Sequence, residues 1–160
     1  MPHLRLQVPE EWLRDEFTRE TGFSAPKLLD HLVEVVCGLQ MEDIAAPDER
    51  SDEPASEPVM RSLINRKNLK HALIPVYHSG VAGDLSKGFL PATFSAGNDT
   101  PGRTPEVRRN AAEVIGNEID EFVGDLPGLE SVTVHVQDID RDRGYTTTAS
   151  RKKKRDQPKV

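Results

Sequence analysis

The alternation of apolar and polar residues divides the chain into two similar units, and this pattern limits the possible folds more than any other feature. In each unit an alternating segment is followed by an amphipathic helical segment and then by a second extended segment, which predicts strand, helix, strand. Proline in a first turn needs no amide partner, and glycine can adopt the backbone conformation that ends a helix. The predicted elements are strand 3–8, a helix between Ser24 and Gly38 and strand 70–78 in the first unit, and strand 87–95, a helix between Thr104 and Gly124 and strand 131–139 in the second.

The order β-α-β-β-α-β predicts an α+β fold (two α/β units) with two helices on one face of a four-stranded mixed sheet. A long connection that carries one helix joins parallel strands, and the common crossover hand places both helices on the same side. Two architectures share this order: the ferredoxin-like split βαβ sandwich, and an arrangement in which the two units pair about a pseudo-twofold axis. Pro75 and Pro91 remove ladder donors from the two middle strands. At these points we therefore expect bulges, edge positions or pairing on one side only.

Charge is distributed unevenly along the chain. The formal net charge is -6, yet residues 42–57 alone hold seven acidic residues and one basic residue, whereas residues 151–160 hold six basic residues and one acidic residue. Segments so charged and so poor in apolar residues have little to bury. We expect a single domain over residues 1–149 with an acidic mobile insertion at about 41–66, followed by a basic disordered tail at 150–160. The tail has no interleaved aromatic residues, so we expect no nucleic-acid partner.

Cysteine content and hydropathy exclude several classes of protein. A single cysteine, Cys37, excludes an internal disulfide framework and any multi-cysteine metal site. The five histidines show no metal-ligand spacing. No stretch approaches ~18 uninterrupted apolar residues, and the first residues lack the apolar run of a signal peptide. We therefore expect a cytoplasmic protein with no membrane partner and no metal.

Two short motifs indicate a possible chemistry. Met1 and Pro2 stand directly before the first predicted strand, so removal of Met1 would leave a secondary amine at the end of the sheet. In the second unit residues 102–108 (GRTPEVR) and 110–114 (NAAEV) resemble the loop-to-helix segment of 5-carboxymethyl-2-hydroxymuconate isomerases, which are trimeric members of the tautomerase superfamily. The resemblance covers the start of the chain and residues from about 70 to 146.

The resemblance implies the tautomerase fold, which is the second of the two architectures, and a site at the start of the first strand. In that family a proline nitrogen is the catalytic base and acid, and arginines hold the carboxylates of the substrate. Carried over by position, Pro2 is the catalytic residue and Arg103 binds one carboxylate. The second family arginine falls where this sequence has Lys70. Lysine cannot form the bidentate fork of a guanidinium, so the substrate is held differently or Arg66 or Lys67 holds it.

The chemistry implied by this resemblance requires no cofactor. An ordinary α-amine has a pKa of roughly 7.7–8.0, and burial or neighbouring cations lower it, so the amine of Pro2 would be a base near neutral pH. It would remove a proton alpha to a carbonyl and return it further along a conjugated system, while Arg103 and Lys70 stabilise the dienolate. Tyr145 falls where the family often has an aromatic pocket wall.

Two functions follow as expectations. The first is a keto–enol tautomerase of a small unsaturated oxo-acid, as in aromatic degradation, formed by a homotrimer with active sites at subunit interfaces. The alternative is a non-catalytic tautomerase-like or ferredoxin-like binding or assembly domain, which the missing second arginine, the strand prolines and the insertion favour.

Overall fold

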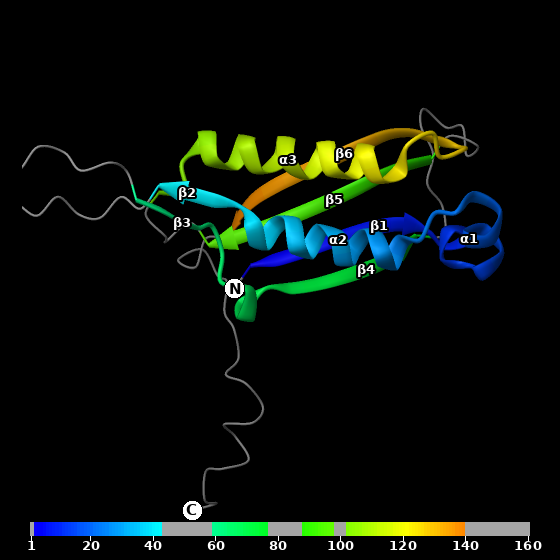
Figure 1. Cartoon of the computed structure of the whole chain (residues 1–160), viewed down its shortest axis with the longest axis horizontal. Helices are drawn as coiled ribbons and strands as arrows, with labels where there is room; N and C mark the ends of the chain where they lie inside the picture. Colours follow the sequence, from blue (N-terminus) through cyan, green and yellow to red (C-terminus); the bar gives the residue numbers. More distant parts are fainter. Residues whose placement is uncertain (1, 43–58, 77–87, 98–101, 140–160) are drawn as a thin grey trace, which may run out of the picture.

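The computed structural model describes residues 2–42, 59–76, 88–97 and 102–139, which form a four-stranded sheet, two long helices and several smaller elements (Figure 1). The two long helices lie side by side across one face of the sheet, so the fold has two layers. The sheet strands are β1 (His3–Pro9), β4 (Lys70–Val76), β5 (Gly88–Gly97) and β6 (Leu129–Ile139), and the α-helices are α1 (Asp15–Thr21), α2 (Ala25–Gly38) and α3 (Pro105–Val123). The short elements are the 3-10 turns η1 (Glu10–Leu13) and η2 (Arg66–Asn68) and the strands β2 (Gln40–Glu42) and β3 (Met60–Ser62).

Strand order distinguishes the two architectures that share this element order. The sheet runs β4-β1-β5-β6, with β1 parallel to β4, β5 parallel to β6, and β1 antiparallel to β5. The two strands of each unit are therefore direct neighbours, whereas a split βαβ sandwich places a strand of the other unit between them. The predicted mixed sheet with both long helices on one face is confirmed, and the ferredoxin-like alternative is wrong.

Strand alternation places the core between the sheet and the helices. Three alternating residues of β1 are fully buried: Leu4, Leu6 and Val8. The register sets Leu6 beside Leu73 of β4 and beside Ala92 of β5. Paired residues point to the same face of a sheet, so these side chains form one apolar layer under α2 and α3. The residues that alternate with them, such as Arg5, face away from the helices.

Both strand prolines lie where a missing amide donor costs little. Pro75 is in β4, which forms one edge of the described sheet. Pro91 is in β5 but outside the ladder with β1, which runs from Ala92 to Ser95, so β5 pairs only with β6 at this point of the described sheet. The expected edge position and one-sided pairing are confirmed.

The long helices begin and end where the sequence predicts. The Val107 N–H donates to Oγ1 of Thr104 at 3.3 Å and caps the start of α3. Gly124, with φ of 51°, follows the last residue of this helix. Ser24 precedes α2, which has proline in its first turn, but the Ser24 side chain makes no capping hydrogen bond. Chain geometry and the proline, rather than a hydroxyl cap, therefore define the start of α2.

The apolar stripe of α3 is buried over only part of its width. Its central residues lie in the core: Ala111, Ile115 and Ile119. Val114 and Phe122, at the edges of the stripe, are 39% and 37% exposed. The stripe is thus wider than the surface that covers it, and α3 presents apolar side chains to its surroundings.

Residues 10–22 close the end of the sheet that lies opposite the N-terminus (Figure 1). Trp12 is only 5% exposed and stacks on Phe17 with ring centroids 5.6 Å apart. Phe23 meets Trp12 edge to face at the same centroid distance. Gly22, with φ of 75°, ends α1 and turns the chain toward α2. Aromatic side chains of this segment therefore cover one end of the core.

The ends of the expected acidic insertion belong to the fold. β2 and β3 pair antiparallel. Met41, Leu63 and Ile64 are at most 4% exposed, so the apolar ends of segment 41–66 pack into the core rather than projecting from it. Residues 43–58 and the basic tail lie outside the described residues. Of the described helices, none is long and apolar enough to cross a membrane.

Candidate active site

Pro2 lies buried at the end of the sheet where β1 and β4 begin and where β5 and β6 end (Figure 1). Its carbonyl oxygen accepts a hydrogen bond from the backbone N–H of Lys70 at 3.0 Å. This bond continues the parallel ladder between β1 and β4 and fixes the backbone of Pro2. The candidate catalytic proline is therefore held at the start of a central strand.

Lys70 and His3 occupy paired positions beside Pro2. His3 lies opposite Lys70 on one side and opposite Ser95 on the other. Burial lowers the pKa of His3, and the charges of Arg5, the amino terminus and Lys70 lower it further. Burial first, and then these positive charges, therefore favour the neutral imidazole. His3 was not among the residues predicted from the sequence, although its place directly after Pro2 on an alternating strand was a usable signal.

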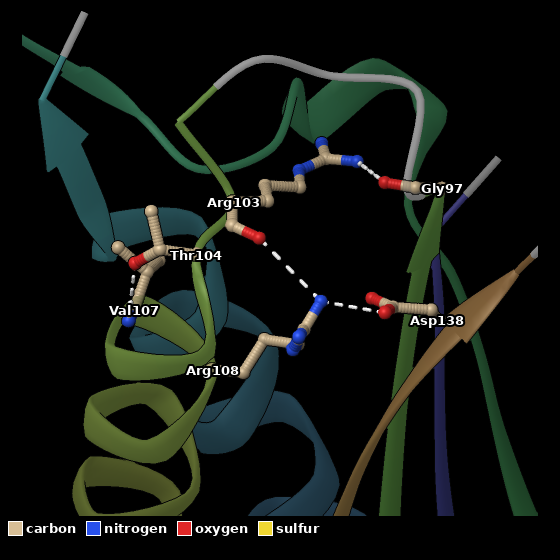
Figure 2. Close-up of polar contacts among 6 residues, drawn as sticks. All are labelled: Gly97, Arg103, Thr104, Val107, Arg108 and Asp138. Atoms are coloured by element: carbon tan, nitrogen blue, oxygen red, sulfur yellow. Dashed lines mark hydrogen bonds and ion pairs between the residues drawn. The ribbon is translucent and has the colours of Figure 1, made fainter. Parts of the chain in front are cut away.

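Arg103 reaches the same end of the sheet from the loop before α3. Its Nη1 donates to the carbonyl oxygen of Gly97, the last residue of β5, at 2.5 Å (Figure 2). Its Nη2 donates to the carbonyl oxygen of Leu63 at 2.8 Å. Gly102 permits this approach, because its φ is 91° and a Cβ there would lie 2.7 Å from the carbonyl oxygen of Glu42. The guanidinium thus ties the end of β5 to the segment after β3.

Arg108 connects the backbone of Arg103 to the end of β6. Figure 2 shows its guanidinium between the two: Nη1 lies 2.5 Å from Oδ2 of Asp138 and 3.4 Å from the carbonyl oxygen of Arg103. The two side chains of this ion pair are 31% and 37% exposed, so the pair contributes at most ~1 kcal/mol to stability. Its main effect is to hold the start of α3 against the sheet. The sequence carried no signal for this contact, because it depends on strand register.

Arg66 and Lys67, the other candidates for the second cation, have contacts elsewhere. The Arg66 guanidinium forms a bidentate pair with Glu34 on α2. This pairing raises the pKa of Arg66 and lowers that of Glu34. The Lys67 backbone N–H donates to Oδ1 of Asn65 within η2. The structure therefore places Lys70, rather than Arg66, directly beside the first residue of β1, which follows Pro2.

The described residues account for three of the four predicted site residues. Pro2, Lys70 and Arg103 come together at one end of the sheet, whereas Tyr145 lies outside the described residues. Across the described ranges, no group of three or more His, Cys, Asp and Glu side chains is arranged to hold a metal ion.

The strand order and the helical layer define the class: this is the tautomerase fold, with two βαβ units related by a pseudo-twofold. Comparison with solved structures gives the particular likenesses. The chain resembles a 5-carboxymethyl-2-hydroxymuconate delta-isomerase with a TM-score of 0.60 and 17% identity, over 100% of this chain and 95% of the other. It resembles a 5-carboxymethyl-2-hydroxymuconate isomerase from Deinococcus radiodurans R1 with a TM-score of 0.54 and 15% identity, over 92% and 90% of the two chains.

A third likeness is to a fused 4-OT protein described as a wild-type symmetric trimer, with a TM-score of 0.50 and 16% identity, over 87% of this chain and 86% of the other. No family model matches the chain, and no curated protein matches its sequence. At these identities the likeness establishes the fold. The tautomerase fold that the sequence resemblance implied is therefore confirmed.

Proposed function

We propose that the protein is a cofactor-independent tautomerase of a small unsaturated oxo-acid, with the amine of Pro2 as general base and acid once Met1 is removed. The observation that carries this proposal is the burial of Pro2 at the start of a central strand, where its carbonyl oxygen is bound by the Lys70 amide at 3.0 Å. A buried and fixed strand start can hold one nitrogen in a constant position toward a substrate, as general acid–base catalysis requires. A frayed terminus cannot do so.

In the proposed reaction the protein takes up one proton from the substrate and returns it, and no electrons pass between them. The lone pair of the Pro2 nitrogen takes a proton from the carbon alpha to a carbonyl, and the electrons of that C–H bond become the dienolate. The protonated amine then returns the proton to a carbon further along the conjugated system. The positive charges of Lys70 and Arg103 favour both the neutral amine before the first step and the anion that follows it.

Arg103 is suited to bind one carboxylate of the substrate because its side chain is already fixed. Its bonds to the carbonyl oxygens of Gly97 and Leu63 hold the guanidinium in one orientation. A fixed cation binds an anion without losing the rotamer freedom that a mobile arginine would lose. In the same proposal Lys70 binds the second carboxylate as a point charge, and Tyr145 forms one wall of the pocket.

We further propose that the enzyme is a homotrimer in the cytoplasm with its active sites between subunits. The face of the sheet opposite the helices carries Arg5, Thr93 and His135 in one register row and has no helix over it in the described chain. A second sheet face can cover such a surface. The likeness to a protein described as a symmetric trimer supports the same arrangement. The substrate class we propose is an enol acid of the kind formed in aromatic degradation.

The test is ultraviolet monitoring of simple enol acids with the wild-type protein and with Pro2→Ala, after intact mass has shown that Met1 is absent from both. We expect catalysed ketonisation by the wild type and a loss of at least about tenfold in kcat/KM for Pro2→Ala, since acid–base catalysis contributes roughly 10²–10⁴-fold. Retention of Met1 in the wild type, or equal rates for the two proteins, would remove the proposal.

One observation favours the alternative of a non-catalytic binding or assembly domain. The Arg103 guanidinium donates to two backbone carbonyl oxygens, which gives this arginine a structural role that needs no substrate. Under this alternative Pro2→Ala and wild type are equally inactive toward every enol acid tested, while Arg103→Met still lowers stability. The rate comparison separates the alternatives, because Arg103→Met lowers stability under both.

A further inference from the structure

A continuous groove at the protein surface runs between α2 and α3 and on toward β2 and β3. Its first part, of about 550 Å³, lies between the second half of α2 and the first turns of α3. Its second part, of about 380 Å³, lies between the start of α3 and the small β2–β3 sheet. Both parts are lined by Gln40, Val107 and Asn110, so they form one depression that extends from Glu118 to Met60. Pro2, Lys70 and Arg103 are not among the residues that line the groove.

Exposed apolar side chains line this groove. Val114 and Met60 are lining residues and are 39% and 52% exposed, and Val59, next to Met60, is 66% exposed. Among the described residues, the only other large apolar side chain so exposed is Phe122. Exposed apolar side chains gathered along a groove are typical of a binding surface for a protein segment or another ligand.

The rim of the groove is acidic. Four carboxylates line it, Glu34, Glu42, Glu106 and Glu118, and no lysine or arginine is among the lining residues. Glu34 is paired with Arg66, and Glu118 lies 2.7 Å from the ring of His31. Glu42 and Glu106 lie at the β2 end of this rim.

Glu106 is ionised at neutral pH. Its own backbone amide, the Thr104 side chain and the nearby charges of Arg109 and Arg108 all lower its pKa. An apolar groove with ionised carboxylates on its rim fits lysine and arginine side chains, whose methylene stems cover apolar surface while their charged ends reach the carboxylates.

The chain itself contains a segment of this chemistry, residues 151–155 (RKKKR). The described chain ends at the end of β6, where Asp138 is bonded to Arg108 on the first turns of α3, close in sequence to Glu106 and Val107. Residues 140–150 span at most roughly 38 Å at about 3.5 Å per residue. From Val107 to Glu118, α3 is about 17 Å long at 1.5 Å per residue. The basic segment can therefore reach the whole groove.

We infer that residues 151–155 dock in the groove between α2 and α3. The connection of residues 140–150 gives the basic segment an effective concentration of about 1 mM at the groove, so an affinity too weak for a separate peptide is sufficient within one chain. Residues 43–57 compete for the same cations, because they hold six acidic residues and one basic residue. The groove differs from that segment in offering an apolar surface as well as charge.

Zero-length carbodiimide cross-linking of the full-length protein, read by peptide mass spectrometry, tests this inference. The reagent joins a lysine to a carboxylate only when the two are in contact. We expect links from Lys152, Lys153 or Lys154 to Glu106 and Glu118 on α3. Links confined to residues 43–57, or the absence of any link to the groove, would overturn the inference.

Two surface variants and one control make the test specific. Glu42→Lys reverses charge at the rim, and Val114→Asn removes apolar surface without changing charge. We expect each to lower the yield of links to Glu106 and Glu118 by about threefold, the effect of one weak surface contact. Glu20→Lys, an equal charge change on exposed α1 at the opposite end of the fold, should leave the yield unchanged. Equal yields in wild type and both groove variants would contradict docking in the groove.

Discussion

Replacing Arg103 by methionine should destabilise the fold, because this side chain joins three separate segments. Its guanidinium donates to the carbonyl oxygens of Gly97 and Leu63 at 2.5 Å and 2.8 Å. A hydrogen bond from a charged group contributes about 1.5–3 kcal/mol, and methionine leaves both carbonyl oxygens without this donor. Arg103 is only partly buried, so we expect a loss near the lower end, about 2–4 kcal/mol in the free energy of unfolding. At ~2–4 °C per kcal/mol for a chain of this size, Tm falls by about 5–15 °C.

Urea unfolding followed by far-ultraviolet circular dichroism measures this change, with an unchanged m-value as the sign that the two-state comparison holds. Arg109→Met is the matched control, because Arg109 is exposed in the first turns of α3 and should change stability by less than about 0.5 kcal/mol. A stability of Arg103→Met within about 0.5 kcal/mol of wild type would refute the reasoning that these two bonds hold the end of β5 to the segment after β3.

The remaining predictions concern the same end of the sheet and the core below it. Because the pKa of His3 is lowered in the folded protein, the unfolded chain binds more protons at this ring, and the stability contributed by the neutral ring is lost as pH falls through the ordinary histidine range near ~6.5. The midpoint of urea unfolding should therefore fall less for His3→Gln than for wild type between pH 7.5 and pH 5.5. Equal falls for the two proteins would contradict this. Gly102→Ala should destabilise by about 1–2 kcal/mol or more, because φ is 91° and the new Cβ would lie 2.7 Å from a backbone oxygen, whereas Gly38→Ala, with open space around it, should be neutral or stabilising in the same urea experiment. Leu6→Ala, at a fully buried position, should cost about 2–5 kcal/mol by urea unfolding, and a cost below 1 kcal/mol would mean that this layer is not the core.

The spacing of apolar residues predicted the strands and the long helices, because each of these elements buries one face and exposes the other. Alternation in β1 and the three- and four-residue spacing in α3 are local properties, and so are the glycine and proline that mark helix ends. The order of the strands is not local. Whether β4 or β6 lies beside β1 depends on pairing between residues far apart in the sequence, such as His3 with Lys70, about 70 positions away. Element order alone therefore left two architectures open, and the structure distinguishes them.

The small β2–β3 sheet escaped prediction for a different reason. Each strand has only three residues, so no alternation extends far enough to be recognised. Met41 and Leu63 show that even a segment of low mean hydropathy can contribute single residues to a core.

The candidate site was predicted by resemblance at Pro2, Arg103 and Lys70. The structure places all three at the same end of the sheet, and their roles remain predictions. The contacts of Arg103 could not be predicted, since a guanidinium bonded to two carbonyl oxygens and one exposed at a helix start have the same sequence.

The most direct test of the proposed function is titration of the Pro2 nitrogen itself, by ¹⁵N NMR of protein labelled with ¹⁵N-proline and shown by intact mass to lack Met1. We expect an amine resonance that titrates below the roughly 7.7–8.0 of an ordinary α-amine. The rise of kcat/KM with pH for a simple enol acid should follow the same titration, because the neutral amine is the base. Retention of Met1, or a rate that rises with pH independently of the titration of this nitrogen, would contradict the assignment of Pro2 as the catalytic base.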